Sequence, residues 1–241
     1  MIAAYSAAPA VVKRIFLALL VLGFGAQLAV ASVAVAGGVE IPAGQPLASP
    51  AHVNFGLETA SQDARSLADW IIASNDSHAM PFVIVDKKQA KVFVFDADGR
   101  LRGASAVLLG LGRGDASVPG IGNRKLSSIR PAERTTPAGR FVAALAHDLS
   151  GAEILWVDYD NAIAMHPVVT TNAKERRTQR LASASLLDKR ITYGCINVPA
   201  LFYKNVVSPA FKGTNGIVYV LPESRSMQQV FISYISAPRT Q

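Results

Sequence analysis

Cysteine is nearly absent from this chain: its 241 residues contain one, Cys195, together with four histidines. One cysteine excludes an internal disulfide, and with the histidines scattered it leaves no zinc-binding pattern. The sequence therefore predicts neither a metal nor a cofactor. In an oxidising compartment cysteines usually pair, so an unpaired one is either buried and inert or a reactive thiol. From the count alone, both interpretations of Cys195 stay open.

Signatures of other function classes are also missing. No Gly-x-Ser-x-Gly run supports a serine hydrolase. The glycine-rich residues 110–114 are followed by no helical pattern and no Gly-Lys-Ser/Thr, which argues against a nucleotide-binding loop. The net charge is +7, but the basic residues are not interleaved with aromatics and no nucleic-acid module is present. A basic surface suits an anionic polymer, although a merely soluble basic protein fits the charge equally well.

Residues 1–36 have the pattern of a signal peptide or a membrane anchor. Lys13 and Arg14 precede an apolar run over residues 15–26, and Ala34-Val35-Ala36 is an A-x-A cleavage pattern, with Ala29-Val30-Ala31 as a second candidate. If uncleaved, residues 15–35 are long enough to span a bilayer, which needs about 20 residues. We expect an exported protein of the periplasm or cell envelope, with membrane contact only through an uncleaved N-terminus. The sequence indicates nothing about oligomeric state.

The rest of the chain divides into three parts. Residues 37–79 are expected to be a linker that contains a short helix over 61–75, because Leu67, Trp70 and Ile71 recur at helical spacing and Ser61 can cap the helix. Residues 80–222 form the predicted catalytic domain, and residues 223–241 a C-terminal tail. Strands are expected at 81–86, 92–95, 101–109, 141–146, 154–159, 162–165 and 216–221, and helices at 172–187 and 199–207. The predicted fold is mostly β with a few helices (α+β).

The lone cysteine lies in a small-residue turn between apolar residues. Ile191, Ile196 and Val198 flank the pair Gly194-Cys195, an arrangement that presents a thiol at the edge of a packed core. The amide N–H groups of Gly194 and Cys195 then lie close to the sulfur. A thiol there can be a nucleophile, and those amides can hold an oxyanion. A free thiol is mostly protonated at neutral pH, so it needs a base as its partner.

Three runs, in order along the chain, resemble signatures of the L,D-transpeptidase (YkuD) family of cell-wall enzymes. The Ser/Thr-His-Gly-Cys-Ile/Val/Leu-Arg/Asn run of that family is matched at five of six positions by Thr192-Tyr193-Gly194-Cys195-Ile196-Asn197. Its Thr-Pro-x-Gly-x-Phe/Tyr turn and strand is matched at residues 136–141. The histidine that follows a short apolar strand in the family is matched by His166. The resemblance covers residues 80–222.

The resemblance implies a YkuD-like β-sandwich with Cys195 as nucleophile and His166 as the base that serves it. The substrate it implies is a peptidoglycan tetrapeptide stem, which would form a thioester acyl-enzyme on Cys195 and pass to an amine of the wall or of a protein. Gly194, Tyr193, Thr192 and Asn197 would supply the oxyanion hole or support the turn. Tyr193 stands where the family has a histidine. His147, beside Asp148, is the second candidate for the base.

His166 and Cys195 lie 29 residues apart, longer than the resemblance leads us to expect. The additional residues between His166 and Cys195 form a basic segment that contains Arg176, Arg177 and Arg180. Either it is a lid whose arginines bind substrate carboxylates, or it is a solvated surface insertion. Two other functions remain open. The same site would be a hydrolase if water were the acceptor, and an inactive protein would only bind stem peptides.

Overall fold

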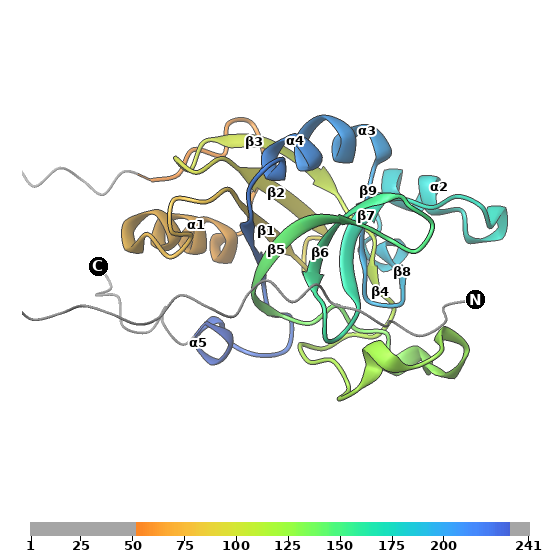
Figure 1. Ribbon diagram of the computed structural model, residues 1–241. Coiled ribbons are helices and arrows are strands. Elements are labelled where there is room, and N and C mark those ends of the chain that lie inside the picture. The colour runs from red at the N-terminus through yellow and green to blue at the C-terminus, as the bar shows by residue number, and fades with distance from the viewer. Residues whose placement is uncertain (1–51, 232–241) are drawn as a thin grey trace, which may run out of the picture. The chain divides into compact units, whose positions relative to one another are not determined.

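A computed structural model describes residues 52–231 (Figure 1). The expected signal or anchor of residues 1–36, and residues 37–51 of the linker predicted after it, fall outside the described residues. Of the helices between residues 52 and 231, none is both long and apolar enough to cross a membrane.

The core of the fold is an eight-stranded sheet in the spatial order β3-β2-β1-β10-β5-β6-β7-β9, accompanied by a small ladder of β4 and β8. β1 pairs in parallel with β10, and β7 with β9, while the other neighbours in the large sheet are antiparallel (Figure 1). The strands are β1 (Phe82–Asp86), β2 (Lys91–Phe95), β3 (Leu101–Ala106), β4 (Leu109–Gly110), β5 (Gly139–His147), β6 (Glu153–Asp158), β7 (Ile163–Pro167), β8 (Arg190–Thr192), β9 (Ile196–Val198) and β10 (Gly216–Val220).

Strand β5 joins the two halves of this sheet. Its first residues, 139–143, pair with β10, and its last, 144–147, pair with β6. Alternate residues of both halves meet in one buried cluster, to which Val83, Val218, Leu155 and Met165 belong. The sheet therefore folds over on itself as a β-sandwich. Burying each such side chain stabilises the fold by about 1.5–3 kcal/mol.

A second core covers the other face of β1, β2 and β10. The helix α1 (Gln62–Ser74) packs there with Leu67 and Ile71 fully buried, beside Phe82 and Tyr219 of the strands. Ser61 caps this helix, since its hydroxyl accepts a hydrogen bond from the Ala64 N–H at 3.2 Å. The short helix α5 (Met227–Val230) adds to the same core. The predicted helix and its cap are confirmed.

The remaining helical elements are short. One continuous stretch contains α3 (Ala200–Phe202), a π-helical turn (Tyr203–Val207) and α4 (Ser208–Phe211). The loop between β4 and β5 holds three 3₁₀ turns, and the segment between β7 and β8 holds α2 (Arg177–Ala182) between two more. The 3₁₀ turns are Ile121–Asn123, Leu126–Ser128, Pro131–Glu133, Ala173–Glu175 and Leu186–Lys189.

The prediction of a mostly β fold with a few helices is confirmed, but the helix expected over 172–187 is wrong. Arg176 adopts a left-handed conformation (φ 50°) and Ser183 an extended one, so only six residues between them are α-helical. That helix buries none of its residues. Without an apolar face to pack, a longer helix gains little from tertiary contacts.

Candidate active site

The pairing of β7 with β9 places Cys195 and His166 on the same face of the sheet. The two strands are parallel with His166 opposite Asn197. Met165 and Ile196 point into the core between the two halves of the sheet, so the alternating residues His166 and Asn197 point outward. Cys195, two residues before Asn197, shares this outer face and packs against a cluster that contains Trp156.

The Cys195 thiol is half-buried and held as a neutral S–H. Its sulfur lies 3.8 Å from the carbonyl oxygen of Ala162, a distance at which a thiol can donate a hydrogen bond. Burial raises the pKa of Cys195, although the N–H groups of Ala164 and Cys195 and the charge of Arg177 act in the opposite direction. Because the thiolate is the nucleophilic form, this thiol needs a base to remove its proton.

His166 is oriented through both of its ring nitrogens. Nδ1 lies 2.8 Å from the carbonyl oxygen of Pro167, and Nε2 lies 3.0 Å from Nδ2 of Asn197. Burial lowers the pKa of His166; the Pro167 carbonyl and the carboxylate of Asp148 work against that effect, and Arg177 reinforces it. The imidazole is therefore neutral at pH 7, the form in which it can accept a proton.

Cys195 and His166 do not touch in this arrangement. No hydrogen bond joins them among the contacts of the described residues, where Nε2 is instead occupied by Asn197. Strand rise and strand spacing put positions related in this way about 8 Å apart between Cβ atoms. Catalytic hydrogen bonds are often long or poorly aligned before substrate binds.

The turn before the sulfur is held by two threonines. The Thr192 hydroxyl donates to the carbonyl oxygen of Cys195 at 2.6 Å and accepts from the N–H of Gly194 at 3.1 Å. The Thr136 hydroxyl donates to the carbonyl oxygen of Gly194 at 2.7 Å. Of the two amides expected to hold an oxyanion, that of Gly194 is thus already engaged. The amide of Cys195 bonds no oxygen in the described part of the chain, so it is the donor that stays available.

Gly194 is required at this turn, and its replacement by alanine should be costly. Its φ is +134°, and a Cβ there would lie 2.6 Å from Cδ1 of Ile163 and 2.8 Å from the carbonyl oxygen of Thr135. We expect Gly194→Ala to lower the free energy of unfolding by about 3 kcal/mol in urea titrations. Gly151→Ala is the matched control, because Gly151 also has a positive φ (+83°) but nothing within 4 Å. Equal losses in the two variants would contradict this account of the turn.

The ring of Tyr193 packs against a guanidinium. The guanidinium of Arg134 lies 3.9 Å over its ring, and the same guanidinium donates to the carbonyl oxygen of Ile129. Tyr193 therefore anchors the loop between β4 and β5 against the turn. Arg134 was not predicted as part of the site. Thr136 lies in the run matched at 136–141, and that run was the available signal for its importance.

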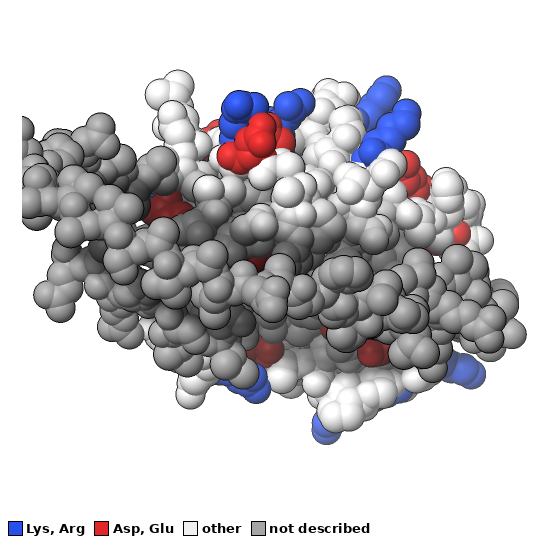
Figure 2. Space-filling model, turned by 60° about the vertical axis from the view of Figure 1, so that its left-hand side comes forward, with Lys and Arg blue, Asp and Glu red and all other residues white. Residues whose placement is uncertain are grey.

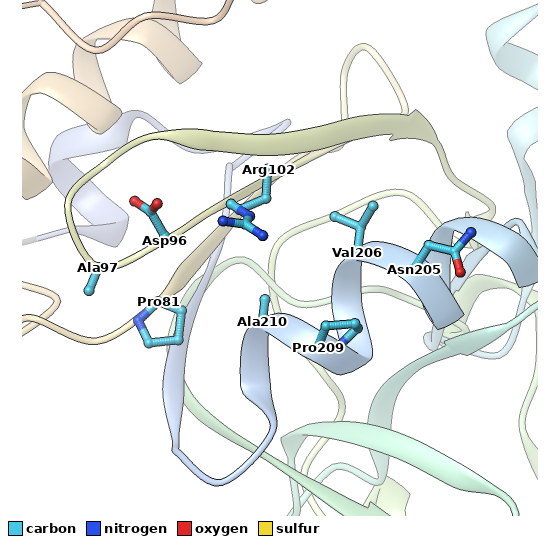
Figure 3. A pocket seen from close by; sticks show the side chains of 8 residues that line it. All are labelled: Pro81, Asp96, Ala97, Arg102, Asn205, Val206, Pro209 and Ala210. Atoms are coloured by element: carbon cyan, nitrogen blue, oxygen red, sulfur yellow. The ribbon is translucent and has the colours of Figure 1, made fainter.

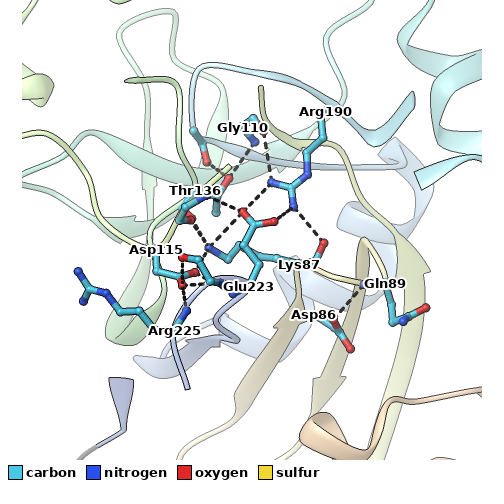
Figure 4. A network of polar contacts seen from close by, with 12 residues as sticks. Asp86, Lys87, Gln89, Gly110, Asp115, Thr136, Arg190, Glu223 and Arg225 are labelled. Carbon is cyan, nitrogen blue, oxygen red and sulfur yellow. Dashed lines mark hydrogen bonds and ion pairs between the residues drawn. The ribbon is translucent and has the colours of Figure 1, made fainter. Parts of the chain in front are cut away.

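Behind the turn lies a buried network of four charged side chains (Figure 4). Lys87 bonds Asp115 at 2.7 Å, and Arg190 bonds Glu223 at 2.5 Å, all four side chains being at most 8% exposed. Lys87 also donates to the carbonyl oxygen of Thr136 at 2.9 Å. The network thus reaches Gly194 through Thr136, and it fixes the position of the turn.

The three arginines predicted to bind substrate have different surroundings. Arg177 is 13% exposed and donates through Nη1 to Oδ1 of Asn197 at 2.7 Å and through Nε to Glu175. Arg180 bonds the carbonyl oxygens of Glu175 and Asp188. Arg176 is exposed and, with Arg180 and Asp188, lines a polar hollow of about 250 Å³. Only Arg177 is joined to His166, through Asn197.

The other histidines lie outside this arrangement. His147 is exposed at the end of β5, and its ring has no hydrogen bond to another described residue. His52 pairs with Asp69 at 2.7 Å near the start of the described chain. The rings of Trp156 and Tyr159 stack with their centroids 4.7 Å apart. Trp156 is buried in the cluster against which Cys195 packs, while Tyr159 is 63% exposed.

A separate cavity of about 280 Å³ lies between the β2–β3 turn and α4, where Arg102 points between Asp96 and Val206 (Figure 3). It includes no residue of the predicted site. On the part of the described surface that is visible in Figure 2, Lys and Arg side chains stand in separate groups near the upper and lower edges, with acidic side chains beside some of them.

No family model matches this chain, and no curated protein matches its sequence. Solved structures do resemble it. The cell-shape-determining protein Pgp2 of Campylobacter jejuni has a TM-score of 0.42 at 15% identity, over 66% of this chain and 57% of that one. An L,D-transpeptidase of Mycobacterium tuberculosis H37Rv has a TM-score of 0.35 at 15% identity, over 58% of this chain and 57% of that one. The catalytic domain of the Enterococcus faecium L,D-transpeptidase has a TM-score of 0.33 at 19% identity, over 58% of this chain and 95% of that one.

This chain therefore spans less than two thirds of the length of the first two of these proteins. A likeness of this extent carries no argument about what the chain does.

Proposed function

We propose that this protein is an exported cysteine L,D-transpeptidase of the cell envelope, with residues 80–222 as its catalytic domain. Its substrate is a peptidoglycan tetrapeptide stem, and its product a crosslink or an attachment to the wall. The observation that carries the proposal is that the lone thiol and a neutral imidazole lie on one face of paired strands β7 and β9. The three matched sequence runs support the same class of reaction.

In the proposed first half-reaction, the Cys195 sulfur attacks the carbonyl carbon of the L,D peptide bond. The thiol proton passes to Nε2 of His166, the S–C bond forms, and the negative charge on the carbonyl oxygen is held by the Cys195 N–H. A single donor of this kind lowers the barrier by about 3–4 kcal/mol. The C–N bond then breaks, and the proton on Nε2 moves to the leaving amine. A thioester on Cys195 remains.

In the second half-reaction, His166 removes a proton from an acceptor amine, which attacks the thioester and frees the thiol. The same site is a hydrolase if water replaces the amine. A specific observation favours a third function, a stem-peptide binding protein without turnover, because Nε2 accepts a hydrogen bond from Asn197 rather than from the thiol.

Purified protein incubated with disaccharide-tetrapeptide fragments of the wall tests these functions by mass spectrometry of the products. We expect fused fragments with loss of the terminal D-residue, and no product with Cys195→Ala. Trimmed fragments without fused ones would make the protein a hydrolase, and intact fragments would leave only binding. Release of the D-residue by the Cys195→Ala protein would overturn the mechanism.

A further inference from the structure

Three hydrogen bonds in series determine the protonation of His166. A guanidinium has only donors, so Arg177 Nη1, at 2.7 Å, must face the oxygen of the Asn197 amide. The nitrogen of that amide, also only a donor, then faces His166 Nε2 at 3.0 Å. Nε2 must accept and so carries no proton, while Nδ1 carries one and donates it to the Pro167 carbonyl at 2.8 Å.

The consequence is that the one basic atom of the imidazole is already in use. Asn197 is fully buried, and its amide cannot turn round while Arg177 holds its oxygen. The thiol proton of Cys195 has no free acceptor on His166 until the hydrogen bond from the Asn197 amide to Nε2 breaks. Arg177 belongs to α2, in the segment that lengthens the spacing between His166 and Cys195, so the segment controls the base from a distance.

The guanidinium of Arg177 also has a donor that the described residues leave unused. Arg177 is 13% exposed and uses Nε for Glu175 and Nη1 for Asn197, while Nη2 donates to none of the described residues. In the proposed reaction the leaving amine must come next to His166. The carboxylate of the leaving D-residue is only two bonds from that amine, which brings it beside Asn197 and Arg177.

We propose that Arg177 is a positioning and specificity-determining residue that holds His166 unavailable through Asn197 until the free terminal carboxylate of the stem takes its guanidinium. A carboxylate pairs with a guanidinium through two parallel hydrogen bonds, so it takes the unused Nη2 together with Nη1 and displaces Asn197 Oδ1. The Asn197 amide then turns, Nε2 is freed, and the thiol proton has an acceptor. This inference rests on the proposed function, and it restricts the substrate to stems that end in a free carboxylate.

The test compares acylation of Cys195 by a tetrapeptide stem and by the same stem with its terminal carboxylate amidated. In the wild type, amidation should slow acylation at least about tenfold, the effect of losing one charge-assisted hydrogen bond. In Arg177→Met, the two stems should react at rates within about twofold of each other. Lys174→Met, which removes an exposed charge from the same segment, should discriminate as the wild type does.

A second readout follows the tautomer of His166 by ¹⁵N NMR without substrate. We expect the Nδ1–H form in the wild type and in Lys174→Met, and a mixture of both tautomers in Arg177→Met. Unchanged discrimination together with an unchanged tautomer in Arg177→Met would overturn the inference, while acylation in the wild type would still support the proposed function. No acylation of the wild type by either stem would instead count against the proposed function.

Discussion

A protein carrying His166→Gln is expected to acylate Cys195 at least about a hundredfold more slowly than the wild type at pH 7, the usual contribution of a general base. Burial makes the thiol pKa higher than its ordinary 9.0 and the imidazole pKa lower than its ordinary 6.5. The pair therefore starts as S–H and neutral imidazole, and the base must act during the attack. The measurement is the rate of adduct formation with a tetrapeptide stem, followed by mass across a pH series.

The direction of the pH dependence follows from these shifts. In the wild type the rate should fall only as His166 gains a proton, below pH 6.5. Without the imidazole, the rate should instead rise with ionisation of the thiol, above pH 9. His147→Gln removes the second candidate base, which is exposed, and should leave both the rate and the profile unchanged. If His147→Gln produced the large loss and His166→Gln did not, the base would be misassigned.

The largest effect on stability is expected from breaking the buried ion pair between Lys87 and Asp115. Both side chains are fully buried, and removing one leaves the other charged or unsatisfied in the interior. We expect Asp115→Ala to lower the free energy of unfolding by about 3–5 kcal/mol. Chemical denaturation followed by tryptophan fluorescence measures the loss. Asp98→Ala, which breaks an exposed ion pair with Arg100, should change stability little.

A double-mutant cycle separates the ion pair from the packing around it. Lys87→Met combined with Asp115→Ala should cost clearly less than the sum of the two single changes, because no lone charge remains. Additive losses would mean that the two groups act independently. We also expect the single variants to slow acylation, since Lys87 is joined to the Cys195 turn through Thr136 and Gly194.

Local patterns were sufficient to predict most of the strands. The short apolar run at residues 162–165 predicted a strand from whose end His166 emerges, and helical spacing with a capping Ser61 predicted α1. The small residues at 194–195 indicated a turn. These features depend on residues that are close together in the sequence, so they can be predicted from a single sequence.

The hydrogen bonds and packing that set the state of the site depend on contacts between residues that are far apart in the sequence. The parallel register that sets His166 opposite Asn197 joins strands separated by a long segment, and β9 has only three residues. The contact of Arg177 with Asn197, and that of Arg134 with Tyr193, likewise arise only when the chain is folded. No periodic pattern in the sequence predicts these contacts.

The central claim is that Cys195 carries the acyl group of a stem peptide. The most direct measurement is the mass of the Cys195-containing peptide, after acid quench and digestion of protein incubated with a tetrapeptide stem. The account predicts an adduct on this peptide equal to the stem without its terminal residue, which disappears when an acceptor amine is added. A protein that released the terminal residue while this peptide stayed unmodified at every time point would contradict it.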